Sequence, residues 1–258
     1  MRYIALIPAF VYAIGCGQID PPPPLDEDGE PVPIPEPLDD WLNFLEIVPE
    51  EELSVRPTIT IAFNAYLDPT TYDSYSTARL QSGGLRHGSR VDYRMTRREI
   101  HFRPTSDLEP ELQYELVWTA DDVRSVTGSP LHPRASLPTF MIRDDLETSP
   151  PLQRPEVSWR EVEELFEAHC TSCHGDSRWS QLPMLTPETL IGARSDQVDA
   201  MLVEPFHPAR SYLMHKILPD YPVRRFTEQP PPWSDQPPLS TDDIERIEHW
   251  IANGAPHP

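Results

Sequence analysis

The chain has 258 residues, with 42 acidic and 21 basic side chains, so its formal net charge is −21. No stretch resembles the basic surface that neutralising phosphates requires, which argues against a nucleic-acid partner. The 33 prolines against 10 glycines exclude a simple helical bundle, and the length favours a multidomain chain with extended spacers.

Residues 1–16 have the pattern of an export signal. Arg2 supplies the positive start, and the apolar run that follows is too short to span a bilayer as a mature helix. The run ends in small residues before Cys16, which resembles the lipobox of bacterial lipoproteins. That resemblance implies an exported chain with a lipid on Cys16. Because Gly17 follows, it also implies anchoring to a Gram-negative outer membrane, on its periplasmic side or its surface; an ordinary signal cleaved nearby is the alternative.

Residues 17–46 are predicted to form a tether. Between Gly17 and Glu50 there are ten acidic residues and no lysine or arginine, with prolines at 21–24, 31, 33, 35 and 37. Such a segment buries too little apolar area to fold, and proline favours extended polyproline II. About twenty residues at ~3.1 Å each would hold the folded part up to roughly 60 Å from the membrane. We expect 41–45 to pack as the lead-in to the next domain, with a partner-binding peptide as the alternative.

Residues 47–143 have the pattern of a β-sandwich. Short alternating runs separated by turn residues are expected strands. These runs are 58–63, 90–94, 99–103 and 113–118. Landmarks such as Leu67-Asp68-Pro69, Phe102-Arg103-Pro104 and a final apolar segment at 140–142 resemble bacterial Ig-like domains of exported proteins. The resemblance implies an all-β Ig-like domain whose default role is a spacer or docking surface.

Residues 144–155 are expected to be a linker, and the pattern becomes helical in 156–258. Ser158 and Glu161 fit a capping box for a helix that runs into the first cysteine of the next motif. Ser240 is expected to cap the last helix, which Gly254 should end. Phe166 and Trp250 are the residues expected where the two helices cross.

Two of the three cysteines stand in the motif Cys170-Thr171-Ser172-Cys173-His174. This spacing allows both thiols to form thioethers with haem vinyl groups while His174 ligates the iron. We therefore predict one covalent haem c, attached through Cys170 and Cys173, with His174 as the proximal ligand. A Cys170–Cys173 disulfide or a metal site with a bystander histidine is the alternative.

The helical segment resembles a family of exported bacterial cytochrome c domains, which implies an all-α c-type cytochrome fold. The resemblance rests on the haem motif and on the segments 186–190, 208–218, 237–240 and 250–255. In that family a Met-Pro-Pro sequence supplies the sixth iron ligand, but here Gln229 stands where the methionine is expected. The candidate distal ligands are Gln229 or an empty position, then His207 or His215, then Met184. Loss of the thioether would lower the reduction potential or leave the position open.

These observations predict a membrane-tethered, exported monohaem cytochrome that transfers single electrons. No acid–base pair points to a catalytic site. The alternatives are a haem enzyme or small-ligand sensor with an open sixth position, and a surface adhesion or assembly lipoprotein. Residues 151–258 hold nine basic and seventeen acidic side chains, so a redox partner protein with a basic docking surface is expected.

Overall fold

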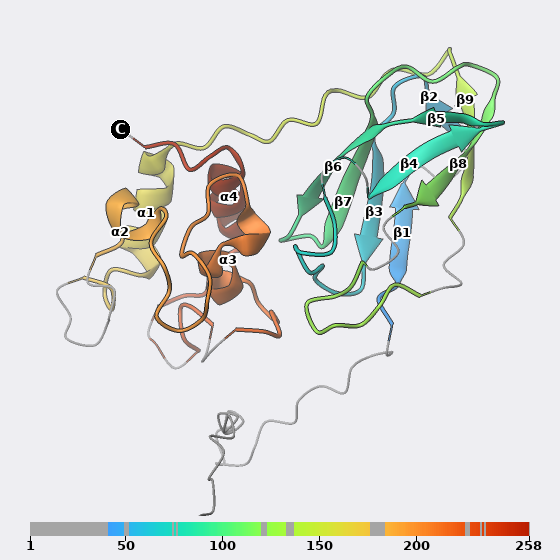
Figure 1. The fold of residues 1–258 in the computed structure, drawn as a ribbon. Helices are drawn as coiled ribbons and strands as arrows, with labels where there is room; N and C mark the ends of the chain where they lie inside the picture. Colours follow the sequence, from blue (N-terminus) through green and yellow to red (C-terminus); the bar gives the residue numbers. More distant parts are fainter. Residues whose placement is uncertain are drawn as a thin grey trace, which may run out of the picture. The chain divides into compact units, whose positions relative to one another are not determined.

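The computed structural model describes ten stretches of the chain (Figure 1). They are 41–48, 52–73, 75, 77–119, 123–132, 137–175, 184–224, 228–232, 234 and 236–257. The predicted export signal, Cys16 and nearly all of the predicted tether lie outside these stretches. Within them, no helix combines the length and the apolar character that crossing a bilayer demands.

The first half of the described chain is a sandwich of two sheets (Figure 1). One sheet runs in the order β1 (Phe44–Val48), β3 (Ile59–Phe63), β7 (Glu99–Pro104) and β6 (Ser89–Arg94). The other runs in the order β2 (Glu52–Ser54), β9 (Thr139–Arg143), β8 (Gln113–Trp118), β4 (Ala78–Ser82) and β5 (Leu85–His87). Neighbouring strands are antiparallel except for β2, which pairs with β9 in parallel.

Alternating side chains explain why these segments form a sandwich. In β3, Ile59, Ile61 and Phe63 are buried while the residues between them are half-buried. The register with β7 places Ile61 opposite Ile100, whose side chain is also fully buried. One face of each sheet therefore joins a shared apolar core, as a half-buried strand with a period of two requires.

The sandwich begins before the expected boundary at 47. Phe44 starts β1, which pairs with β3 along the edge of the first sheet. Just before it, the fully buried Leu42 donates its backbone N–H to the carbonyl oxygen of Pro130 at 2.9 Å. Residues 42–46 therefore belong to the sandwich. Sequence reasoning expected 41–45 only as a lead-in, because β1 is short, contains Glu46 and follows an acidic, proline-rich segment.

After residue 155, the regular elements of the described chain are helices. They are α1 (Trp159–His169), α2 (Pro187–Leu190), the 3-10 turn η1 (Pro208–Arg210), α3 (Tyr212–Ile217) and α4 (Thr241–Ala252). The predicted capping box from Ser158 to Glu161 is present. Ser240 caps the last helix as expected, and it also forms a capping box with Asp243. Gly254 follows the last helix at φ 95°, a left-handed conformation that favours glycine and ends the helix as predicted.

The contact between α1 and α4 is built on tryptophan. The ring centroids of Trp159 and Trp250 lie 5.4 Å apart, and those of Trp159 and Phe166 lie 5.9 Å apart. Trp159 thus lies against both residues that were expected to cross. Sequence reasoning treated Trp159 as part of the cap and overlooked it, although it begins the same apolar stripe.

Candidate functional site

The cysteine–histidine motif forms a tight turn at the end of α1. Cys170 caps the helix, and its carbonyl oxygen accepts the backbone N–H groups of Cys173 and His174 at 3.1 and 2.9 Å. A Cβ on Gly175 would lie 2.8 Å from the carbonyl oxygen of Thr171, so the residue after the histidine has no room for a side chain. The helix end and this close approach keep Cys170, Cys173 and His174, the three residues with a predicted role, together.

Cys170, Cys173 and His174 all line one cavity of about 180 Å³. Most of its wall is apolar, because α1, α2, α3 and the intervening loops contribute large hydrophobic side chains. The apolar lining consists of Phe166, Leu185, Leu190, Leu202, Leu213 and Ile217 together with Pro230 and Pro231. The cavity therefore combines the donor groups of the motif with an environment of low polarity.

Electrostatics keep the first cysteine uncharged. Burial, and then the neighbouring Cys173, raise the pKa of the Cys170 thiol to about 12. A thiol with such a pKa is a poor nucleophile at neutral pH, unlike the reactive cysteine of a redox enzyme. In this stretch of the described chain, Cys170 and Cys173 are not joined in a disulfide.

Gln229 is the one predicted distal candidate that the structure brings to this cavity. It lies in the loop between α3 and α4, and its backbone N–H donates to the carbonyl oxygen of Lys216 at 2.7 Å. This bond fixes the loop against α3, so Gln229 and Lys216 lie side by side. Both residues line the same cavity as His174.

The other three distal candidates lie elsewhere. Met184 has 57% of its surface exposed and does not line the cavity. His215 contacts other residues. Its Nε2 lies 2.9 Å from the carbonyl oxygen of Ala209, and its ring stacks on that of Tyr221 at a centroid distance of 4.4 Å. Burial lowers the pKa of His215. His207 lines a second cleft, described below.

Lys216 is a cavity residue that the sequence reasoning missed. It lies on α3 four residues after Tyr212, and both residues line the cavity together with Leu213. This spacing is one face of a helix, so the pattern could have identified it. Burial, and then the positive charge of Arg224, lower the pKa of Lys216 to about 8.

The donor groups at the cavity suit one kind of metal centre better than another. Within the part of the chain that the structure describes, no group of three or more histidine, cysteine, aspartate or glutamate side chains is arranged to hold a metal ion. A site built from protein ligands alone needs such a group. A haem needs less, because its ring supplies four ligands and the protein adds one or two axial ones. The residues at the cavity therefore fit a haem better than a bare ion.

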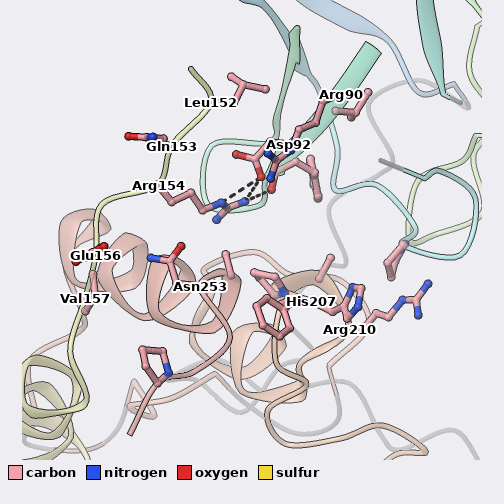
Figure 2. A pocket seen from close by; sticks show the side chains of 18 of the residues that line it. Arg90, Asp92, Leu152, Gln153, Arg154, Glu156, Val157, His207, Arg210 and Asn253 are labelled. Atoms are coloured by element: carbon pink, nitrogen blue, oxygen red, sulfur yellow. Dashed lines mark hydrogen bonds and ion pairs between the residues drawn. The ribbon is translucent and has the colours of Figure 1, made fainter. Parts of the chain in front are cut away.

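A second, larger cleft of about 1360 Å³ lies where the sandwich meets the helical region (Figure 2). His207 and Arg210 line it on the helical side and Arg90 and Asp92 on the sandwich side. Figure 2 shows Arg154, from the linker, directed at Asp92. Charged and apolar side chains share the wall of this cleft, which distinguishes it from the mainly apolar cavity at the cysteines.

Arg154 is the centre of a buried ionic network beside this cleft. Its guanidinium lies 2.9 Å from a carboxylate oxygen of Asp92 in β6 and 3.0 Å from one of Glu248 in α4. Glu248 is 1% exposed and also accepts the backbone N–H groups of Met95 and Thr96, which follow β6, at 2.8 and 2.9 Å. Burial opposes ionisation of Asp92, but Arg154 outweighs it and holds the pKa of that carboxyl below its usual value. The network joins sandwich, linker and last helix.

Comparison with known families identifies the sandwich. Residues 44–140 match the bacterial Ig-like domain family, and this span is less than half of the chain. The chain therefore contains a bacterial Ig-like domain, as the strand pattern predicted. No curated protein matches the chain.

Solved structures resemble parts of the chain at low identity. Domains 1–6 of the surface layer protein SbsC share 12% identity at a TM-score of 0.31, covering 46% of this chain and 16% of that one. An L,D-transpeptidase from Mycobacterium smegmatis shares 8% at a TM-score of 0.26, covering 40% of each chain. The chain thus spans well under a fifth of the surface layer structure. Likeness at this level supports no inference about function.

Proposed function

We propose that residues 156–258 form a c-type cytochrome domain that carries one covalent haem and transfers single electrons. The observation that carries this proposal is the convergence of Cys170, Cys173 and His174 on one apolar cavity. Two thiols at this spacing suit thioether attachment, and the adjacent imidazole suits axial ligation. No acid–base pair for another chemistry was predicted from the sequence.

The residues of the chain have distinct parts in this function. A bound haem would supply the change of oxidation state. Cys170 and Cys173 would hold it, His174 would ligate its iron, and the leucine-rich wall would exclude water. At about 180 Å³ the cavity is smaller than the roughly 300–1,000 Å³ of typical ligand pockets, so its walls must separate when the haem is attached.

The remaining parts of the chain support a proposed location for this carrier. The signal pattern of 1–16 and the position of Cys16 support a lipid-anchored exported protein, held at a Gram-negative outer membrane. The acidic segment that follows would act as the tether. The net charge of −8 on residues 151–258 favours a redox partner with a basic surface, whose encounter rate would fall as salt rises.

The decisive experiment is to determine whether haem is attached. The exported protein is purified from a host with a c-type maturation pathway, and its mass and pyridine haemochrome spectrum are measured. We expect the added mass of one haem. The pyridine haemochrome spectrum should be that of a haem whose two vinyl groups have both been converted to thioethers. Cys170→Ala/Cys173→Ala should lose both signals, while Ser172→Ala, which alters the residue between the cysteines, should keep them. A colourless wild type of unmodified mass would remove the proposal and leave an adhesion or assembly role for the Ig-like domain.

A haem enzyme or ligand sensor with an open sixth position is the second candidate. It is favoured by one observation: Met184, His207 and His215 all lie away from the cavity, and Gln229 offers iron a weak amide oxygen. Rapid binding of carbon monoxide to the reduced protein and of cyanide to the oxidised protein would support it. Resistance to both ligands would favour a six-coordinate carrier.

A further inference from the structure

We propose that Lys216 supplies the sixth ligand of the haem iron, in the position that the sequence assigns to Gln229. This inference rests on the proposed haem site. Lys216 lines the cavity that Cys170, Cys173 and His174 share. It stands next to Gln229, whose backbone N–H it accepts at 2.7 Å.

The choice of Lys216 follows from the donors that line the cavity, which also include Asp196 and Tyr212. The carboxylate of Asp196 is a weaker-field ligand than an amine nitrogen, and the Tyr212 hydroxyl donates to the side-chain oxygen of Gln197 at 2.8 Å. Both cysteine sulfurs are committed to thioethers in the haem protein, and His174 is the proximal ligand. His169 also lines the cavity, but it directly precedes Cys170 on the same helix end, and its Nδ1 lies 3.0 Å from the carbonyl oxygen of Pro237. Lys216 comes from a different element, so it can act from another wall.

The helix that carries Lys216 is held firmly in place. The backbone N–H groups of Tyr212 and Leu213 donate to the carbonyl oxygens of Met201 and Leu202 at 2.8 and 2.9 Å. The N–H of Leu218 returns to the carbonyl of Met214 at 3.0 Å and closes the helix. Lys216 therefore projects from a fixed backbone, which limits the ordering that ligation would require.

The chemistry of the donor atoms separates Lys216 from Gln229. The cavity wall is mainly apolar, and Arg224 is itself held close by, donating to the carbonyl oxygen of Leu218 at 2.8 Å. A neutral primary amine has a lone pair for iron, whereas an ammonium has none. It is also a stronger donor than the neutral amide oxygen of Gln229. On ligation, the iron takes the place of the proton on the nitrogen and the proton passes to solvent.

The experiment compares matched variants of the full haem-loaded chain. Wild type, Lys216→Ala, Lys216→Met and Gln229→Leu are each checked for attached haem by mass. Absorption and electron paramagnetic resonance of the oxidised form then report the axial ligands. We expect a six-coordinate low-spin wild type that resists carbon monoxide, and the same spectra for Gln229→Leu. Lys216→Ala should become high-spin and bind carbon monoxide at least ten times faster.

Lys216→Met replaces the amine by a thioether on another unbranched side chain. It covers the case in which the alanine variant fails to acquire haem. It should remain low-spin with the charge-transfer band of a thioether ligand and a higher midpoint potential. Unchanged spectra in both Lys216 variants, or a high-spin product from Gln229→Leu alone, would overturn the lysine assignment while leaving haem attachment intact. A wild type that lacks haem would instead refute the proposed function, and the assignment with it.

Discussion

The sandwich and the helical region fill their interiors differently. In the sandwich, both sheets contribute large side chains such as Phe63, Phe102 and Phe140, each at most 1% exposed, to one core. In the helical region, α2 and α3 are short, long loops connect the helices, and an apolar cavity lies beside the cysteines. The helical region therefore has less regular structure around its interior than the sandwich has.

The ionic network of Arg154 is the support that the sandwich gives to the helical region. Glu248 of α4 is tied to the linker through Arg154 and to the chain after β6 through the N–H groups of Met95 and Thr96. A buried ion pair adds little net stability compared with apolar packing, but removing one partner is costly. The network should therefore act as a specific joint between the two regions.

The largest expected effect comes from breaking this joint. Glu248→Ala leaves the buried Arg154 with one carboxylate partner. It also leaves the backbone N–H groups of Met95 and Thr96 without their acceptor. We therefore expect the free energy of unfolding to fall by about 3–5 kcal/mol. Urea unfolding followed by tryptophan fluorescence should change from one transition to two, with the helical region unfolding first. In the same helix, Glu245 pairs with Arg97, which is 57% exposed, and Glu245→Ala should cost less than about 1 kcal/mol. Equal costs for the two variants would show that Glu248 is not a joint.

The local elements on either side of the joint could be predicted from the sequence, but the joint itself could not. Alternation identified β3, β6, β7 and β8, and the caps identified α1 and α4, because these signals are local. The position of β9 came from the family resemblance. The strands β4 and β5 were missed, since their residues are largely polar and β5 is an edge. The network of Arg154, Asp92 and Glu248 was invisible, because its members are far apart in sequence and each resembles a surface charge.

The candidate site also has a part that the sequence could predict and a part that it could not. The motif from Cys170 to His174 is contiguous, so spacing alone pointed to its chemistry. The distal side depends on which loop folds over the cavity. Sequence reasoning placed Gln229 there through a family resemblance but did not consider Lys216. The positions of His207 and His215 relative to the cavity could not follow from spacing, because both are set by packing around η1.

Acid titration tests whether the joint is electrostatic. Because Arg154 holds the pKa of Asp92 below its usual value of about 3.8, the ionised carboxylate stabilises the folded state. That contribution is complete above about pH 4 and disappears as the pH falls through the lower folded-state pKa. Asp92→Asn should therefore be less stable than wild type at pH 6, and the difference should shrink below pH 4. A difference that stays constant with pH would assign the role of Asp92 to packing.

The smallest expected effect comes from removing the helix caps. It distinguishes the stability of each helix from the support that the joint gives. Ser158 and Ser240 each accept the backbone N–H of the carboxylate residue three positions further along, Glu161 and Asp243, so either change to alanine should cost about 1 kcal/mol. The two helices differ, however, because α4 carries Glu248, a member of the Arg154 network, and α1 carries no member of it. Loosening the start of α4 with Ser240→Ala should therefore also speed hydrogen exchange at the amides of Met95 and Thr96, and Ser158→Ala should leave them protected. If both variants left these amides unchanged, fraying at the start of α4 would not reach Glu248, and the joint would hold independently of the helix that carries it.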